Sequence, residues 1–239
     1  MDNKKNFIYW GIGTLLLLCI MIYPNIVYAI INNSGITYVI TSIIFALPLI
    51  GLVCILPRKW MYCVATILLT IMSIIDLTMI DLYKDYLLPG GIISTINTNP
   101  QEAAEFYKTN LNEVFRWIPL IVCCVLGCCL YQTRSKLIPN IIILATSLLI
   151  PSVFVFGKVV GSYDSKITFR YYIDHRIWNR TPYNVVFQSI NTVKELNKRK
   201  YIEHTSQISF GAKRTTTTSQ KEVYIFAIGE SLRYDNISL

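Results

Sequence analysis

Charged residues are scarce in this 239-residue chain, in which Asp, Glu, Lys and Arg together make up 15% of the sequence. Soluble domains carry roughly 25% of these residues. Hydrophobic residues make up 53% of the chain, and its mean hydropathy is positive, at +0.46. The shortage of charge argues against an ordinary water-soluble protein and predicts that much of the chain lies in lipid.

Histidine is also scarce, with only His175 and His204 in the chain, and we interpret both as surface residues. None of the seven cysteines lies in the C-terminal third, and all fall in or at the ends of apolar stretches: Cys19, Cys54, Cys63, Cys123, Cys124, Cys128 and Cys129. The Cys-Cys-x3-Cys-Cys pattern at 123–129 fits a soft-metal site, but small packing residues in lipid explain it more simply. The cysteines therefore say little about redox chemistry.

Five apolar stretches are long enough, or nearly so, to cross a bilayer as helices, which takes about 20 residues. They run over 7–30, 36–56, 60–80, 114–132 and 137–156. The fourth is the weakest, because Arg116 and Pro119 lie near its start. The first resembles a signal peptide in having Lys4 and Lys5 before it, but it is long for one and lacks a clear cleavage site. We predict a domain of five transmembrane helices over residues 1–158.

Basic residues in the short connections predict the orientation of these helices. Lys4 and Lys5, Arg58 and Lys59, and Arg134 and Lys136 fall on one side of a five-helix arrangement, whereas the turn at 32–35 is uncharged. The N-terminus is therefore expected in the cytoplasm. The part after residue 158 is expected outside, in the periplasm of a Gram-negative cell, so the protein would be a multi-pass protein of the bacterial inner membrane.

Two carboxylates, Asp76 and Asp81, lie near the end of the third stretch. A carboxylate inside a bilayer is costly and often functional. Asp81 is expected at the outer boundary, where water solvates it, and Asp76 about one helical turn deeper. Asp76 is therefore either a functional residue or an interfacial residue that caps or packs.

The polar connection at 81–113 is too long for a tight turn. Pro89, Gly90 and Gly91 are expected to break the preceding helix. Pro100, with Asn99 as its N-cap, predicts a fresh helix. The sequence therefore predicts a structured loop on the outer, membrane-facing side.

Thr98-Asn99-Pro100-Gln101-Glu102-Ala103 resembles the Thr-Asp-Pro-x-Glu-Ala pattern in the same loop of the lipid A phosphoethanolamine transferases, which include the mobile colistin-resistance enzymes. The resemblance implies that Thr98 and Glu102 line a pocket for the phosphoethanolamine donor. A family asparagine four positions before the threonine is Ser94 here, whose hydroxyl can still form a hydrogen bond. Taken alone, the motif also fits a capped interfacial helix.

Residues 157–201 are polar and basic with interleaved aromatic residues, and the chain from Lys158 onward carries 13 Lys and Arg against 7 Asp and Glu. This composition favours a surface of anionic lipid, where aromatic rings lie at headgroup depth. Nucleic acid would fit the charge but not the compartment. We predict a bridging helix over 181–200 near the membrane within a periplasmic segment, 159–221, that ends in a linker.

Residues 222–228 form a short apolar run rich in β-formers that ends at Gly229, which is typical of a buried parallel strand. The following segment, Gly-Glu-Ser-Leu-Arg-Tyr-Asp-Asn at 229–236, resembles the signature that opens the catalytic domain of the same transferases, within the alkaline phosphatase and sulfatase superfamily. The resemblance implies that Glu230 is a zinc ligand; alone, it also fits a surface turn. Residues 222–239 are therefore expected to be the start of a truncated α/β domain.

The resemblance implies an enzyme that moves phosphoethanolamine from phosphatidylethanolamine to lipid A or core lipopolysaccharide through a phospho-threonine intermediate. Capping acceptor phosphates in this way reduces the capture of cationic peptides such as polymyxins. The nucleophile and the other zinc ligands are expected beyond Leu239, so this fragment alone is expected to be inactive. The alternatives are a phosphoglycerol transferase of the lipoteichoic acid synthase type and a non-enzymatic membrane remnant.

Overall fold

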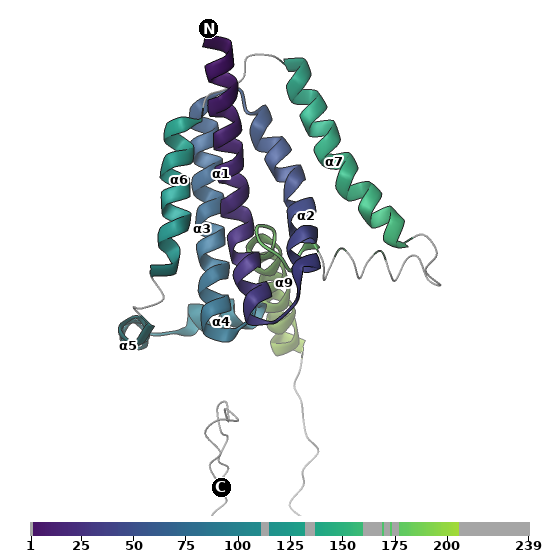
Figure 1. The fold of residues 1–239 in the computed structure, drawn as a ribbon. Helices are drawn as coiled ribbons and strands as arrows, with labels where there is room; N and C mark the ends of the chain where they lie inside the picture. The colour runs from purple at the N-terminus through teal and green to yellow at the C-terminus, as the bar shows by residue number, and fades with distance from the viewer. Residues whose placement is uncertain are drawn as a thin grey trace, which may run out of the picture. The chain divides into compact units, whose positions relative to one another are not determined.

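The computed structural model describes residues 2–110, 115–131, 137–159, 169, 173 and 177–205 (Figure 1). These residues are mostly helical, and no strand occurs among them. The predicted strand at 222–228 lies outside the described residues. The chain divides into two units, Met1–Lys198 and Arg199–Leu239, and the packing described below lies within the first.

Long helices follow the five predicted apolar stretches: α1 Asp2–Ile31, α2 Ile36–Ile55, α3 Lys59–Tyr83, α6 Ile118–Leu130 and α7 Leu137–Val159. Three of them, α1, α2 and α3, are long and apolar enough to cross a membrane. The other two contribute shorter apolar helices, Phe115–Leu130 and Ile141–Gly157. The described part of the chain is thus helical with three candidate membrane spans, and α6, which begins at Ile118, is shorter than the predicted stretch at 114–132.

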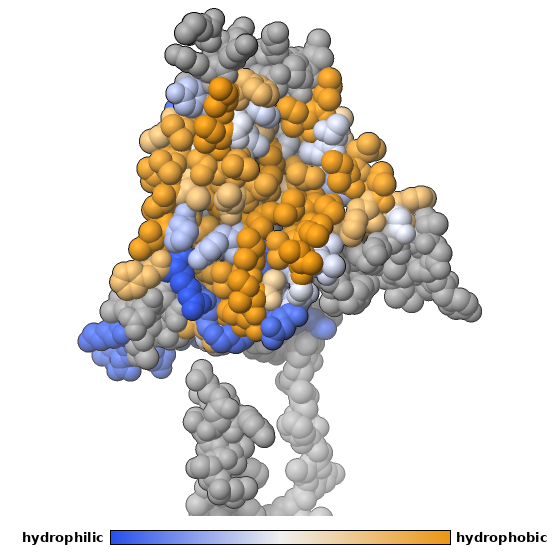
Figure 2. All heavy atoms as spheres, in the orientation of Figure 1, coloured by the Kyte–Doolittle hydropathy of each residue, from blue (hydrophilic) through white to orange (hydrophobic). Residues whose placement is uncertain are grey.

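The helices pack as a bundle in which α1 contacts α2, α3 and α6, while α2 also contacts α7 (Figure 1). Apolar side chains from α1, α2 and α3 fill its centre, among them Leu17, Ala46 and Leu69. Large apolar side chains such as Leu15 and Val125 are exposed on the outside. Figure 2 shows hydrophobic residues over most of the visible helical surface and hydrophilic ones gathered at one end. An apolar surface of this extent is typical of contact with lipid.

Two glycines allow helices to approach closely. A Cβ added at Gly13 in α1 would lie 2.7 Å from Tyr131 Cδ2, and one added at Gly51 in α2 would overlap the hydroxyl of Ser147 in α7. The Tyr131 ring stacks on Tyr62 with 3.6 Å between ring centroids. Tyr62 in turn donates a hydrogen bond of 2.8 Å to the carbonyl of Gly13. The glycines therefore set the spacing of α1 and α2 from their neighbours.

Two short helices follow α3 at one end of the bundle, which we call the α4 end. The first, α4, spans Pro89–Asn97, and the second, α5, spans Pro100–Asn110. The expectation that Pro89, Gly90 and Gly91 break the preceding helix is wrong, because α3 already ends at Tyr83, where Lys84 adopts a left-handed conformation with φ of 60°. Pro89 instead starts α4, since its fixed φ and missing N–H suit the first helical position. The predicted start of a helix at Pro100 is confirmed.

The predicted bridging helix is present as α9, which spans Asn184–Thr205. It begins later than the predicted 181–200, because residues 181–183 form a turn. That turn is packed among the helix ends, and it brings together the polar residues described next.

Candidate functional site at the α4 end of the bundle

The three residues that the family resemblance assigns to a donor pocket, Ser94, Thr98 and Glu102, are all exposed on α4, α5 and the link between them. Thr98 donates a hydrogen bond of 2.8 Å from Oγ1 to the carbonyl of Ser94. The backbone N–H of Glu102 donates to Asn99 Oδ1 at 2.9 Å, and the N–H of Asn99 donates to Glu102 Oε2 at 3.4 Å. This reciprocal pair is a capping box, which confirms Asn99 as the N-cap of α5. A hydroxyl and a carboxylate are thus held on a fixed, exposed helix start.

Asp76 lies in a buried polar cluster formed with residues more than 100 positions later in the chain. Its Oδ2 accepts a hydrogen bond of 2.7 Å from Thr181 Oγ1, and its Oδ1 accepts one of 2.8 Å from Asn184 Nδ2. All three residues are buried. Asp76 is therefore buried within protein, and both of its carboxylate oxygens accept hydrogen bonds.

The cluster continues towards α1 and α4. Asn184 Nδ2 also donates to the carbonyl of Leu87 at 3.1 Å, just before α4 begins. Asn25 of α1 donates to the carbonyl of Thr181 at 3.0 Å, and its Oδ1 accepts a hydrogen bond of 2.6 Å from the Tyr86 hydroxyl. Burial raises the pKa of Tyr86 well above its usual value, so that this phenol stays protonated and remains a donor.

Arg180 contacts α2 from the same turn. Its side chain is buried, and Nη1 donates to the carbonyl of Tyr38 at 3.1 Å, to Ser42 Oγ at 3.0 Å and to Thr41 Oγ1. The guanidinium carbon lies 3.8 Å from the centroid of the Tyr38 ring. Cation–π contact and hydrogen bonds together compensate for the desolvation of this charge.

Aromatic contacts complete the attachment of this turn. The Tyr183 hydroxyl donates to the carbonyl of Phe45 in α2 at 2.9 Å, and burial raises the pKa of Tyr183 to about 12. Trp178 stacks on Phe187 with 5.4 Å between ring centroids and meets Tyr183 edge-on at 5.8 Å. We call the set Asn25, Tyr38, Asp76, Tyr86, Arg180, Thr181 and Asn184 the junction.

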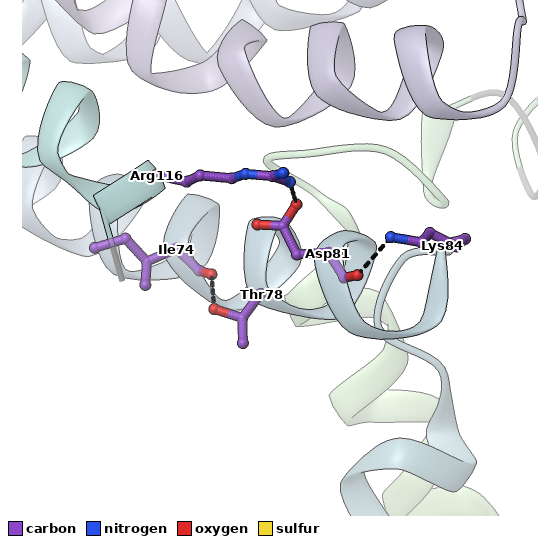
Figure 3. A network of polar contacts seen from close by, with 5 residues as sticks. All are labelled: Ile74, Thr78, Asp81, Lys84 and Arg116. Atoms are coloured by element: carbon purple, nitrogen blue, oxygen red, sulfur yellow. Dashed lines mark hydrogen bonds and ion pairs between the residues drawn. The ribbon is translucent and has the colours of Figure 1, made fainter. Parts of the chain in front are cut away.

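Asp81 does not lie in water at a boundary, as the sequence suggested. It is 6% exposed, and Arg116 Nη1 forms an ion pair with its carboxylate, as Figure 3 shows. Lys84 caps the same helix end by donating from Nζ to the backbone carbonyl of Asp81 at 2.9 Å. The expectation of a solvated Asp81 is wrong because Arg116, at the start of the α6 segment, compensates its charge. Opposite charges at the facing ends of consecutive apolar stretches are the signal that would have predicted this pair.

No protein-family model, no curated protein and no solved structure matches this chain. Its site is therefore interpreted from its own residues.

No metal site is formed by the side chains that the structure describes, because no three of His, Cys, Asp and Glu among them gather closely enough to bind an ion. The seven cysteines are free thiols, with Cys63 donating weakly to the carbonyl of Cys128 at 3.9 Å. Glu230, for which the family resemblance implies zinc binding, lies outside the described residues, as do the side chains of His175 and His204.

Proposed function

We propose that this chain is the membrane part of a phosphoethanolamine transferase of the bacterial inner membrane. The enzyme would transfer phosphoethanolamine from phosphatidylethanolamine to lipid A or core lipopolysaccharide. The observation that carries the proposal is the occurrence of two family motifs in family order, 98–103 in the loop and 229–236 after the helices. Asn99 and Glu102 of the first motif form the capping box that begins α5, and the side chains of Thr98 and Glu102 are exposed there.

The position of α9 also supports the proposal. Because Asn184 donates to the carbonyl of Leu87, α9 begins beside the start of α4, and α4 leads directly to Thr98. Figure 1 shows α4, α5 and the start of α9 at the same end of the bundle. The first residue of α9 therefore lies at the end of the bundle that presents Thr98 and Glu102.

The exposed groups suit the headgroup of the proposed donor, which carries an ammonium and a phosphate. The Glu102 carboxylate complements the ammonium. The Thr98 hydroxyl donates to the carbonyl of Ser94, and it would donate to a phosphate oxygen after rotating away from that carbonyl. Zinc, when bound, would lower the pKa of the nucleophilic hydroxyl and stabilise charge on the transferred phosphoryl group. By the same resemblance, Glu230 would supply one carboxylate oxygen of the four ligands that zinc usually takes.

The proposed topology has five spans, with the N-terminus in the cytoplasm and α9 in the periplasm. Three spans follow from length and composition, and α6 and α7 complete the set through their packing against α1 and α2. The basic residues Arg58 and Lys59 lie at the start of α3, whereas α4 follows the other end of α3, so these charges lie at the end of the bundle opposite to α4.

A reconstituted assay tests the proposal. The gene is read past the codon for Leu239, and the encoded protein is purified and given phosphatidylethanolamine with a fluorescent acyl chain, together with lipid A. We expect fluorescent diacylglycerol to form, and lipid A to gain the mass of one phosphoethanolamine group.

Variants separate the roles of the site residues. Glu230→Ala is expected to abolish transfer, and Thr98→Ala and Glu102→Ala to weaken it. Thr95→Ala is the matched control, because Thr95 is exposed on α4 and makes the same kind of bond, from Oγ1 to the carbonyl of Gly91 at 2.8 Å. Turnover of phosphatidylglycerol instead would favour the phosphoglycerol transferase, and turnover of neither lipid would favour the non-enzymatic alternative.

A further inference from the structure

A carboxylate can lie inside a membrane-spanning helix when protein groups form the hydrogen bonds that water would otherwise form with it. Both oxygens of Asp76 have such partners, Thr181 Oγ1 and Asn184 Nδ2, at 2.7 and 2.8 Å. Both donors come from one short turn that is far away in sequence. The buried charge of α3 is therefore satisfied by the segment that starts α9.

The same turn is also attached to α1, which ends at this end of the bundle, and to α2, which begins there. Arg180 donates to α2 through the Tyr38 carbonyl and Ser42, and the carbonyl of Thr181 accepts from Asn25 of α1. Consecutive residues of the turn thus bind α1, α2 and α3. Such polar contacts fix one relative arrangement more strictly than apolar contacts do, because a shift leaves buried groups without partners.

One face of α9 stays buried beyond its first turn. Asn184, Gln188 and Thr192 lie four residues apart along the helix, and all three are buried. Gln188 Nε2 donates to Asn184 Oδ1 at 3.3 Å, which helps to hold the Asn184 amide towards Asp76. The first residue of α9 and the turn before it thus make the hydrogen bonds to α1, α2 and α3 described above.

We infer that Asp76 is a positioning residue whose carboxylate, together with Arg180, holds the turn at 180–184 and so fixes how α9 leaves the bundle. A carboxylate suits this role because it accepts two hydrogen bonds and presents no donor to Thr181 or Asn184. An asparagine could still accept from Asn184 through Oδ1, but its N–H group would then face Thr181, whose hydroxyl would have to accept in place of donating, and the charge of the acceptor would be lost. The inference goes beyond the proposed transferase activity and holds whether or not the chain belongs to such an enzyme.

Hydrogen exchange of the full chain in lipid nanodiscs tests the inference. Asp76→Asn is expected to speed exchange of the α9 amides at 184–198 by roughly tenfold, the order expected when a hydrogen bond to a charged group is lost. Asp81→Asn is the matched control, because it removes the charge of the other carboxylate of α3, which is also buried and forms an ion pair with Arg116. It is expected to leave α9 exchange unchanged.

Fluorine resonances of 5-fluorotryptophan give a second readout, because the chain contains four tryptophans. Trp178 packs on Phe187 of α9, and Trp117 follows Arg116. Asp76→Asn should shift the Trp178 resonance and Asp81→Asn the Trp117 resonance, each assigned by replacement with Phe. A purely general loss of stability would move both resonances in both variants.

Exchanging the partners provides a rescue. In the double variant Asp76→Asn with Asn184→Asp, the amide and carboxylate trade places and the hydrogen bond between them can re-form. Recovery should be partial, because a carboxylate at position 184 cannot donate to Leu87 as Asn184 does. If Asp76→Asn cannot be purified, Thr181→Val keeps the side-chain shape, removes one donor and should loosen α9 alone. Unchanged α9 exchange in the folded variant, or equal effects of Asp81→Asn on α9, would overturn the inference.

Discussion

Arg116→Ala should destabilise the bundle more than Asp81→Asn, although the two residues form one ion pair. The reason is their unequal burial, since the Asp81 side chain is 1% exposed and the Arg116 side chain is 47% exposed. Removing Arg116 leaves a buried carboxylate without its charged partner. Removing the charge of Asp81 leaves a guanidinium that water or lipid headgroups can solvate.

The expected difference in the free energy of unfolding between the two variants follows from the unequal burial of the two side chains. Removing one partner of a fully buried pair costs about 3–5 kcal/mol. Because one end of this pair is solvent-accessible, we expect about 2–3 kcal/mol for Arg116→Ala. Asp81→Asn should cost less than about 1 kcal/mol, the range of exposed pairs. The double variant should be more stable than Arg116→Ala alone, because it contains no buried charge at this position.

The free energy of unfolding, measured by titrating SDS into the protein in mild detergent, gives these values as a double-mutant cycle. The coupling between the two positions is expected to be about 1–2 kcal/mol. Equal losses for the two single variants, or a double variant whose loss is the sum of both, would refute the argument from burial.

Three further predictions concern packing, capping and pH. Gly51→Ala should lower the free energy of unfolding in the same titration by about 1–3 kcal/mol, because its Cβ would lie 2.9 Å from Ser147 Cβ and disturb the packing of α2 on α7. Gly11→Ala should leave the free energy of unfolding unchanged, because nothing lies within 4 Å of its Cβ. Asn99→Ala should cost α5 about 1 kcal/mol and speed its amide exchange, and unchanged exchange would count against the capping box. Tyr183 has its pKa raised to about 12, so its stabilisation is complete below pH 10 and is lost as the pH rises towards 12. The difference in stability between wild type and Tyr183→Phe should therefore shrink over that range, and a constant difference would contradict it.

Much of the fold was predictable because lipid imposes length and composition on a spanning helix. The helices at 36–56 and 60–80 agree closely with α2 and α3. Pro89 was misinterpreted because a proline is equally compatible with ending one helix and starting the next, and the left-handed residue that ends α3 is Lys84, which carries no such signal.

The junction was only half predictable. The carboxylate of Asp76 was visible in the sequence, because charge in an apolar stretch is conspicuous. Its partners Thr181 and Asn184 were not, since they are ordinary polar residues in a polar segment, and the pairing depends on how the chain returns to α3. The capping box at Asn99 was predictable because all of its contacts lie within four residues.

The mass of lipid A from Gram-negative cells that express the complete gene product tests the central proposal most directly. The proposal predicts lipid A heavier by one phosphoethanolamine group in these cells, and unmodified lipid A in cells that express the Glu230→Ala variant at the same level. Unmodified lipid A and lipopolysaccharide core in both, with the protein present in the inner membrane, would contradict the assignment to this family of transferases.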